Sequence, residues 1–309
     1  MKSEVKKILL TGGNGLLGQK IVKRLKDDPE VALFAAGKGH SRLPKSWDHG
    51  YVWVTLDITN PQAVDQVMAE IQPDAVIHTA AMTQVDDCEM DKESCWQANV
   101  LATTYIVGAC ERYQSRLVHV STDFIFDGEN GPYTEEAEPN PVNLYGWSKL
   151  AAEKAVIGAK CPWSIARTIL VYGIAQDMSR SNIILWVKKS LEQGKQIQVV
   201  NDQWRTPTLA EDLAEGCILM VKKNAQGIFN ISGKDLLTPY QMAILSADYF
   251  GLDKSLIMES NSRIFTQPAK RPPRTGFIID KAIKVLGYAP KSFTDGIGIL
   301  SKQLILAES

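Results

Sequence analysis

The sequence lacks an excess of charge of either sign. Its 309 residues include 34 Lys and Arg against 35 Asp and Glu, a net charge of −1. This balance argues against the basic surface that a nucleic-acid-binding protein or a protein held at an anionic membrane needs. Hydrophobic residues make up 45% of the chain and charged residues 22%, the usual mix for a globular protein with a large core.

Cysteine is scarce, and long apolar runs are missing. The five cysteines form no C-x-x-C pair and the four histidines show no ligand spacing, so neither a disulfide framework nor a metal site is predicted. No stretch approaches the ~18 apolar residues that span a bilayer. Near the N-terminus only Ile8–Leu10 form an apolar run, too short for a signal peptide. A cytoplasmic protein without membrane contact is predicted.

Short β-branched runs alternate with longer helical patterns through the first half of the chain. This alternation predicts a parallel sheet with helices on both faces. The runs Ile8–Leu10 and Leu117–Val120 are mostly apolar, as in strands buried on both faces. The predicted strands are Val5–Leu10, Val31–Ala36, Tyr51–Leu56, Asp74–Thr79, Leu117–Ser121 and Ser164–Tyr172, and the predicted helices are Leu16–Lys26, Pro61–Ile71, Asp91–Tyr113 and Asn143–Ala159.

A glycine-rich turn, Thr11–Gly18, connects the first strand to the first helix. Gly12, Gly15 and Gly18 match the spacing G-x-x-G-x-x-G, and Gly13, Gly15 and Gly18 match G-x-G-x-x-G. Glycines at such a turn let the backbone approach a pyrophosphate, and the helix N-terminus attracts its charge. The turn predicts a Rossmann-like, doubly wound sheet that binds a dinucleotide.

In the second half of the chain, strand and helix patterns alternate less regularly. This predicts a smaller α+β substrate-binding lobe over residues 173–309. The NAD(P)-binding Rossmann domain is predicted over residues 1–172, with elements near 196–232 returning to it. The segment Thr266–Thr275 is rich in Pro and cations and is expected to be extended surface chain. Helices are predicted at Asn182–Gln193, Leu209–Lys222, Pro239–Phe250 and Asp280–Leu286, and strands at Ile197–Val200 and Ile228–Ile231.

The residues after the second strand bear on which dinucleotide is bound. Dinucleotide folds often place an acidic residue there, ~20 residues beyond the glycines, to hold the ribose 2′-OH. Residues 36–42 contain no carboxylate but include Lys38 and Arg42, which could receive a 2′-phosphate. NADP(H) is therefore preferred over NAD(H), and the less favoured alternative is that these cations belong to an ordinary solvated loop. Asp57 could accept from the adenine amino group or cap the helix that begins near Pro61.

A second group of residues follows the fifth strand and begins the next helix. Thr122 ends the strand, and Tyr145 and Lys149 lie one helical turn apart, on one face. A lysine beside a phenol lowers the tyrosine pKa from its usual ~10, which would suit Tyr145 to proton transfer. The hydroxyl of Thr122 could polarise a carbonyl oxygen. The predicted catalytic residues are Thr122, Tyr145 and Lys149.

Taken together, these motifs resemble the extended short-chain dehydrogenase/reductases, and most of all the dTDP-4-dehydrorhamnose reductase family. The resemblance covers nearly the whole chain and is densest up to about Gly173. It rests on the segments TGGNGLLG, VSTDFIFDG, EEAEPNPVNLYGWSKLAAEKA, RTILVYG, DQWRTPTLAEDLA and KRPPRTGF.

The family resemblance implies an NAD(P)H site in the Rossmann lobe and a nucleotide-sugar in the cleft. It implies that Tyr145 is the proton donor and that Thr122, Asp123 and Tyr145 contact the sugar. With the residues singled out above, the predicted cofactor-binding set is Gly12, Gly15, Leu16, Leu17, Gly18, Lys38, Arg42, Asp57, Ile58, Ala80, Ala81, Met82, Tyr145 and Lys149.

Two positions depart from the family pattern. Leu170 stands where the family commonly has a tryptophan that contacts the sugar, and Arg205 stands where it has glycine. The expected activity is reduction of a 4-keto nucleotide-sugar, as in dTDP-rhamnose biosynthesis. The alternatives are an epimerase of the same superfamily and an NADP-binding regulatory subunit without turnover. A homodimer is a candidate assembly.

Overall fold

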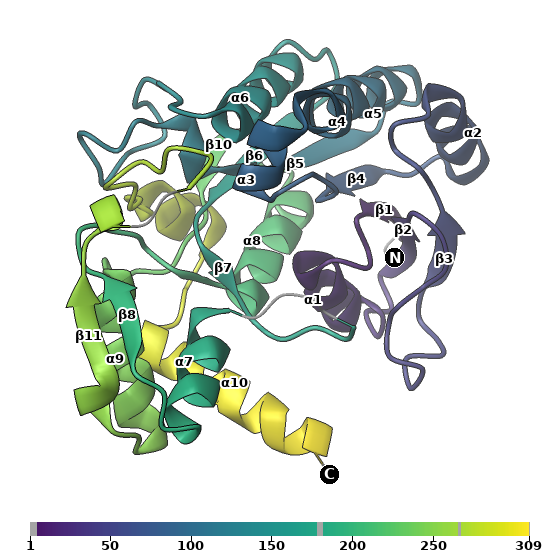
Figure 1. Ribbon diagram of the computed structural model, residues 1–309. Helices are drawn as coiled ribbons and strands as arrows, with labels where there is room; N and C mark the ends of the chain where they lie inside the picture. The colour runs from purple at the N-terminus through teal and green to yellow at the C-terminus, as the bar shows by residue number, and fades with distance from the viewer. Residues whose placement is uncertain (1–4, 178–181, 265–266, 309) are drawn as a thin grey trace.

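A seven-stranded parallel sheet forms the centre of the protein (Figure 1). The computed structural model describes residues 5–177, 182–264 and 267–308. The strands of the sheet are β1 (Lys6–Thr11), β2 (Val31–Gly37), β3 (Val52–Thr55), β4 (Ala75–His78), β5 (Arg116–Thr122), β6 (Trp163–Thr168) and β10 (Gly227–Asn230). Their order, β10-β6-β5-β4-β1-β2-β3, changes direction between β1 and β4. This arrangement confirms the predicted α/β, doubly wound fold.

Helices cover both faces of the sheet (Figure 1). On one face lie α1 (Leu16–Leu25) and α8 (Ala210–Lys222), and on the other α2 (Pro61–Ile71), α5 (Ala102–Arg112) and α6 (Leu144–Ile157). Alternate residues of a strand enter different cores, so Leu10 packs in the first and Leu9 in the second. This explains why the central strands read as continuous apolar runs.

The long helix predicted at Asp91–Tyr113 consists of several segments. Asp91 caps α4 (Lys92–Trp96), a π-helical turn follows at Gln97–Leu101, and α5 completes the run. A short helix that was not predicted, α3 (Val85–Met90), precedes it. The π-helical turn places Asn99 beside the carboxyl end of β4, where its side chain bonds to the backbone of Met82.

The single strand predicted at Ser164–Tyr172 is wrong. β6 ends at Thr168, and Leu170 adopts a left-handed backbone with φ of 40°, which no strand can continue. The next two residues form β7 (Val171–Tyr172), which pairs with β9 (Thr208–Leu209) in a separate small sheet. The chain leaves the central sheet at Leu170.

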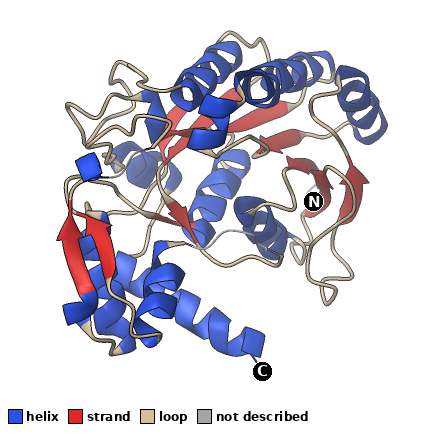
Figure 2. Cartoon of the chain, in the orientation of Figure 1, coloured by secondary structure: helices blue, strands red, loops and turns tan. Residues whose placement is uncertain are grey.

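A second group of helices packs below the sheet in the view of Figure 2. It comprises α7 (Ile183–Glu192), α9 (Pro239–Phe250) and α10 (Phe293–Glu308), with the strands β8 (Ile197–Val200) and β11 (Ile257–Ser260) paired in parallel. The sequence analysis did not predict α10, and the helix predicted at Asp280–Leu286 is a π-helical turn at Ala282–Leu286. Two 3-10 turns complete this part, at Lys254–Leu256 and Ser262–Ile264.

The predicted domain division stays a prediction. Of its returning elements, α8 and β10 lie with the central sheet, whereas β8 pairs with β11 in a separate two-stranded sheet. The predicted ranges also include residues 1–4, 178–181, 265, 266 and 309, which lie outside the described residues. Among the helices that the structure describes, none has both the length and the apolar character needed to cross a bilayer.

The segment predicted as extended surface chain, Thr266–Thr275, is not simply a surface feature. Residue 266 lies outside the described residues, and the rest of the segment forms no helix or strand. Ala269 is 3% exposed and Thr275 is fully buried. Arg274 forms a bridge with Trp204, which belongs to a distant part of the chain. The expectation of a surface segment was wrong for these buried positions, because Thr275 donates to Asp123 after the end of β5 and the backbone of Ala269 donates to Asp86 of α3.

Candidate active site

The glycine turn is packed too closely to accept side chains. Gly12 has φ of 75°, and a Cβ atom there would lie 2.6 Å from Thr79 Oγ1 and 2.8 Å from the backbone nitrogen of Ala80. A Cβ atom on Gly18 would lie 2.2 Å from the carbonyl oxygen of Gly12. The turn, the start of α1 and the end of β4 therefore lie in direct contact, as a dinucleotide cradle requires.

The N-terminus of α1 is open to an anion. Gly15 is the N-cap residue, and no side chain caps the helix. The first turn begins with Leu16 and Leu17, both half-buried. The first N–H groups of a helix have no partner within the helix, and the dipole adds partial positive charge. This geometry fits a pyrophosphate at the predicted place.

The loop that carries the predicted cations lies against the glycine turn. Asn14 Oδ1 accepts from the backbone N–H of Arg42 at 2.7 Å, and its Nδ2 donates to the carbonyl of His40 at 3.0 Å. Trp53 Nε1 donates to the carbonyl of Gly39 at 3.1 Å. The sequence analysis missed both Asn14 and Trp53, because nothing in their local pattern marks a contact across the loop.

Lys38 and Asp57, predicted separately, form an ion pair of 2.9 Å. The Lys38 side chain is 82% exposed. Hydrogen bonds from Thr59, and then the Lys38 ammonium, hold the pKa of Asp57 at about 2. The alternative role of Asp57 as a helix cap is wrong, because the side chain of Asn60 caps α2.

The carboxyl end of β4 continues into Ala80, Ala81 and Met82, which are half-buried. Asn99 Oδ1 accepts from the backbone N–H of Met82 at 2.8 Å, and Asn99 Nδ2 donates to its carbonyl at 3.0 Å. Ile58, near the end of β3, is also half-buried and packs against the second core. These residues follow the carboxyl ends of β3 and β4, and the strand order of the sheet reverses between β4 and β1.

The predicted catalytic residues meet at the end of β5. The chain turns there into a 3-10 turn, Asp123–Ile125, and Thr122 Oγ1 donates to Asp123 Oδ1 at 3.1 Å. Asn143 caps α6, and a Cβ atom on Gly146 would lie 2.1 Å from the carbonyl oxygen of Phe124. This close approach brings Tyr145 within hydrogen-bonding reach of Thr122.

Lys149 does not act on Tyr145 as predicted. Its Nζ donates to the carbonyl of Val120 at 2.8 Å and contacts His119 Nε2 at 3.3 Å. Burial raises the pKa of Tyr145, and hydrogen bonding with Thr122 opposes that rise. Burial also lowers the pKa of Lys149 to about 8. The phenol is therefore held in its protonated form, the form needed for a proton donor.

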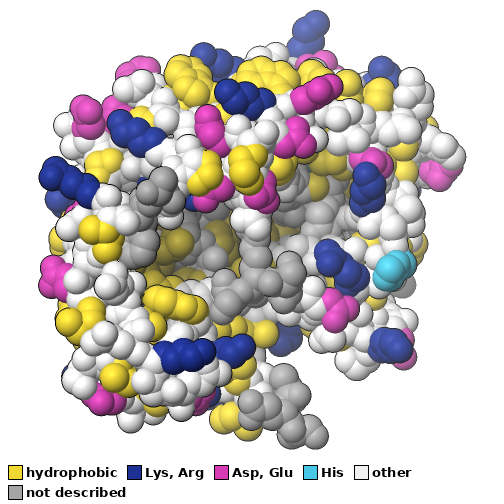
Figure 3. Space-filling model, in the orientation of Figure 1, with side chains coloured by type: hydrophobic (Ala, Val, Ile, Leu, Met, Phe, Trp, Pro, Cys, Tyr) yellow, Lys and Arg dark blue, Asp and Glu magenta, His cyan; other side chains and the backbone are white. Residues whose placement is uncertain are grey.

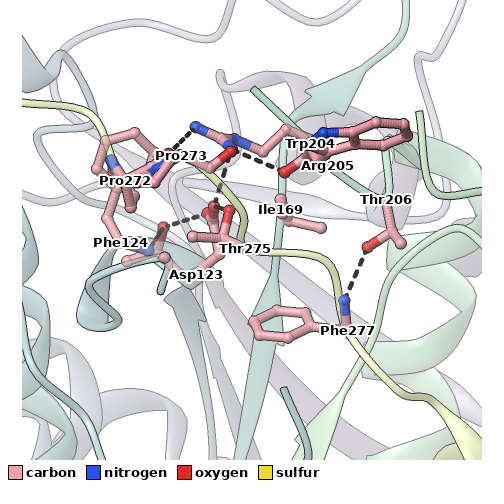
Figure 4. Close-up of polar contacts among 12 residues, drawn as sticks. Asp123, Phe124, Ile169, Trp204, Arg205, Thr206, Pro272, Pro273, Thr275 and Phe277 are labelled. Carbon is pink, nitrogen blue, oxygen red and sulfur yellow. Dashed lines mark hydrogen bonds and ion pairs between the residues drawn. The ribbon is translucent and has the colours of Figure 1, made fainter. Parts of the chain in front are cut away.

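Asp123 is enclosed by residues from distant parts of the chain (Figure 4). Its carboxylate accepts from Thr275 Oγ1 and lies 3.9 Å from Arg205 Nε, and the residue is 2% exposed. Direct contact between Asp123 and a sugar stays a prediction. In the sequence, Arg205 stands out only because the family has glycine at this position. No local motif marks Thr275 as part of a site.

Two buried polar atoms at this end of the sheet remain unpaired among the described residues. They are Ser121 Oγ and His119 Nδ1. Buried polar atoms are normally hydrogen-bonded, so they are consistent with a polar ligand or ordered water at this edge. Within the described ranges, no group of three or more His, Cys, Asp or Glu side chains could hold a metal ion.

An open groove lies beside the Arg205 segment. Its volume is about 420 Å³. In the space-filling view, hydrophobic side chains line the hollow between the sheet and the lower helices (Figure 3). Gln203, two residues before Arg205, is on its wall. The lining residues are Asn182, Ile183, Trp186, Gln198, Val199, Val200, Gln203 and Pro239.

A known protein family and individual proteins are similar to this chain over most of its length. The sequence profile described as the RmlD substrate binding domain matches residues 6–305. A probable low-salt glycan biosynthesis reductase of Haloferax volcanii is 31% identical over 94% of this chain and 96% of that protein. The methionine adenosyltransferase 2 subunit beta of Danio rerio is 31% identical over 93% of this chain and 87% of that protein.

A solved structure shares the fold. The dTDP-4-dehydrorhamnose reductase of Bacillus anthracis, in complex with NADP, is 25% identical and superposes with a TM-score of 0.81. The match covers 96% of this chain and 99% of that protein. The similarity therefore includes the sheet, the glycine turn and the lower lobe together.

Proposed function

The chain belongs to the RmlD substrate binding domain family, and we propose that it reduces a 4-keto nucleotide-sugar with NADP(H). The observation that carries this proposal is the meeting of Thr122, Tyr145 and Lys149 at the carboxyl end of β5. The glycine turn follows β1 on the same carboxyl edge of the sheet, where only β4 separates β1 from β5. A proton donor thus stands beside a site suited to a hydride carrier.

The residues present fit a bound dinucleotide. The uncapped start of α1 would hold the pyrophosphate at Gly15, Leu16 and Leu17. Lys149 uses two of its three ammonium donors within the protein, which leaves one for the nicotinamide ribose. Lys38 and Arg42 would hold a 2′-phosphate. Lys38 would have to leave Asp57, which costs little because an exposed ion pair contributes only ~0–1 kcal/mol.

The chemistry assigned to the protein's own residues is proton transfer. When bound, the nicotinamide supplies a hydride to the ketone carbon. Tyr145 gives its phenolic proton to the ketone oxygen and becomes a phenolate. Thr122 has a single hydroxyl hydrogen, now donated to Asp123, and can turn it to the phenolate oxygen. The proton lost from Tyr145 is then regained from solvent.

The open groove is the proposed place for the nucleotide half of the substrate. Its volume of about 420 Å³ lies within the usual range for ligand sites, ~300–1,000 Å³. Trp186 is 40% exposed on its wall and offers a ring face to a base. Amide side chains at Gln198 and Gln203 offer both donors and acceptors.

The test is NADPH oxidation with a panel of 4-keto sugars carried on dTDP, UDP, GDP and CDP. The proposal expects turnover with at least one of them, with Tyr145→Phe as the inactive control. Binding of the corresponding 4-hydroxy sugars, the products of reduction, can be followed separately by thermal shift. A ligand that binds the folded state raises its apparent stability.

A second candidate function is a regulatory subunit that binds NADP without turnover. The observation that favours it is the 31% identity to methionine adenosyltransferase 2 subunit beta over 93% of the chain. Under this hypothesis the protein binds NADPH but oxidises it with no keto-sugar, and it binds a methionine adenosyltransferase catalytic subunit in a pull-down. Turnover that depends on Tyr145 would contradict it.

A further inference from the structure

Arg205 is a buried cation that links two distant segments of the chain (Figure 4). Its side chain is 6% exposed. Its backbone pairs in both directions with Leu237, at 2.9 and 2.8 Å, so its position is fixed. Its Nη2 donates to the carbonyl of Pro272 at 2.6 Å, and its Nη1 donates to the carbonyl of Pro273 at 3.1 Å. The guanidinium therefore holds the 272–275 segment in place.

The same guanidinium faces the carboxylate of Asp123. Arg205 Nε lies 3.9 Å from Asp123 Oδ2, and both side chains are at least nine-tenths buried. Burial raises the pKa of Asp123, whereas Arg205 and the hydroxyls of Thr275 and Thr122 lower it. A buried carboxylate without a cation tends to take up a proton. Arg205 is the charged group in position to prevent this.

The charge of Asp123 bears on the proton donor through Thr122. A carboxylate only accepts hydrogen bonds, so Thr122 must donate to it, as the contact of 3.1 Å shows. The Thr122 oxygen also accepts from the backbone N–H of Phe124 at 3.3 Å, which leaves its second lone pair to face Tyr145. The negative charge of Asp123 also raises the pKa of Tyr145 and favours the neutral phenol. A protonated Asp123 would remove both effects.

We infer that Arg205 is a positioning residue that keeps Asp123 ionised behind Thr122 and so maintains Tyr145 as a proton donor. For its kinetic consequences, this inference rests on the proposed function. The groups that face Asp123 are Arg205, Thr275, Thr122 and Tyr145, each from a different part of the chain. The guanidinium has two separable roles, its charge toward Asp123 and its forked donors toward the prolines.

The experiment separates these roles with matched variants. Arg205→Met removes the charge and the hydrogen-bond donors. Arg205→Lys keeps the charge but loses the planar pair of donors that binds the carbonyls of Pro272 and Pro273. We expect the basic limb of the kcat–pH profile to move to lower pH by about one unit in Arg205→Met and in Asp123→Asn, since losing a nearby like charge shifts a pKa by about that much. Arg205→Lys should keep the wild-type limb while KM rises.

The double variant Arg205→Met/Asp123→Asn tests whether Arg205 acts through Asp123. We expect the limb to move no further than in Asp123→Asn alone, whereas independent structural effects would add. An additive shift, or an unmoved limb in Arg205→Met, would overturn the inference. If Arg205→Met fails to fold, Arg205→Gln serves as the neutral variant, because it keeps amide donors for the proline carbonyls.

A readout without turnover separates this inference from the proposed function. Infrared spectra at pH 7 report the carbonyl stretch of a protonated carboxyl group. We expect that band in Arg205→Met, and we expect it to be missing in the wild type and in the double variant. Its absence from Arg205→Met would overturn the inference even for an active enzyme. Lack of NADPH oxidation with every keto-sugar would instead count against the proposed function, and the infrared result would still decide the charge of Asp123.

Discussion

The ammonium group of Lys149 donates a hydrogen bond of 2.8 Å to the carbonyl oxygen of Val120. This contact ties α6 to β5 two residues before the end of the strand at Thr122. Lys149 thus holds together the two elements that carry Tyr145 and Thr122. Its role in fixing the site is independent of any direct effect on the tyrosine.

Replacing Tyr145 by Phe should abolish most turnover and leave cofactor affinity nearly unchanged. The substitution removes the hydroxyl but keeps the ring, which packs edge-to-face with Phe124. Positioned proton transfer contributes ~10²–10⁴-fold, so kcat should fall by about that factor. Lys149→Met is the contrasting variant and should weaken both NADPH binding and turnover. Full activity of Tyr145→Phe in a steady-state assay would show that another group donates the proton.

The protein should bind NADPH more tightly than NADH, and Lys38→Ala should reduce that difference. Lys38 forms an ion pair with Asp57, so Asp57→Asn should free the ammonium and increase the preference for NADPH. Lys45→Ala, a change at another exposed lysine of the same loop, is the control and should have no effect. Titration by calorimetry measures each affinity. Equal binding of the two cofactors to the wild type would refute the roles given to Lys38 and Arg42.

The free energy of unfolding should depend on pH through Lys149. Burial lowers its pKa from 10.5 to about 8 in the folded protein. Between these values the unfolded chain binds more protons than the folded one, so this residue's contribution to stability rises with pH. Urea denaturation should therefore show the wild type gaining stability relative to Lys149→Met from pH 8 to pH 10.5. Parallel curves for the two proteins would show that the buried amine titrates normally.

Leu170→Trp should improve turnover of dTDP-4-dehydrorhamnose, if that sugar is a substrate. Leu170 is 44% exposed where the chain leaves β6, so an indole there has room. An aromatic ring packed on a sugar adds apolar contact, and the gain should be seen as a lower KM. Leu170→Phe is the intermediate case. An unchanged kcat/KM in Leu170→Trp would show that the departure from the family pattern has no effect on this sugar.

Gly146→Ala should destabilise the protein and displace Tyr145. A Cβ atom there would lie 2.1 Å from the carbonyl oxygen of Phe124. Overpacking of this kind costs about 1–3 kcal/mol in the free energy of unfolding. Gly158→Ala, at the other end of α6, is the matched control, because its nearest neighbour would lie 3.5 Å away. Denaturation midpoints of the two variants that fell together would contradict this explanation.

The sequence by itself determined the fold class and the location of the two main motifs. Periodic apolar runs, the glycine turn and the pair Tyr145 and Lys149 are local patterns, and each depends on only a few neighbouring residues. Such patterns place residues on the correct element even when its ends are misjudged. This is why the predicted doubly wound sheet is confirmed, and why Thr122 and Tyr145 lie in contact.

Only the tertiary structure decided which partner each charged side chain of the site meets. Lys38 pairs with Asp57, Lys149 with the backbone of Val120, and Arg205 with Asp123, across separations that no sequence period connects. The left-handed turn at Leu170 likewise separated one predicted strand into two sheets. Pairing energies and pKa values depend on burial and on distances between atoms, and the folded chain alone sets both.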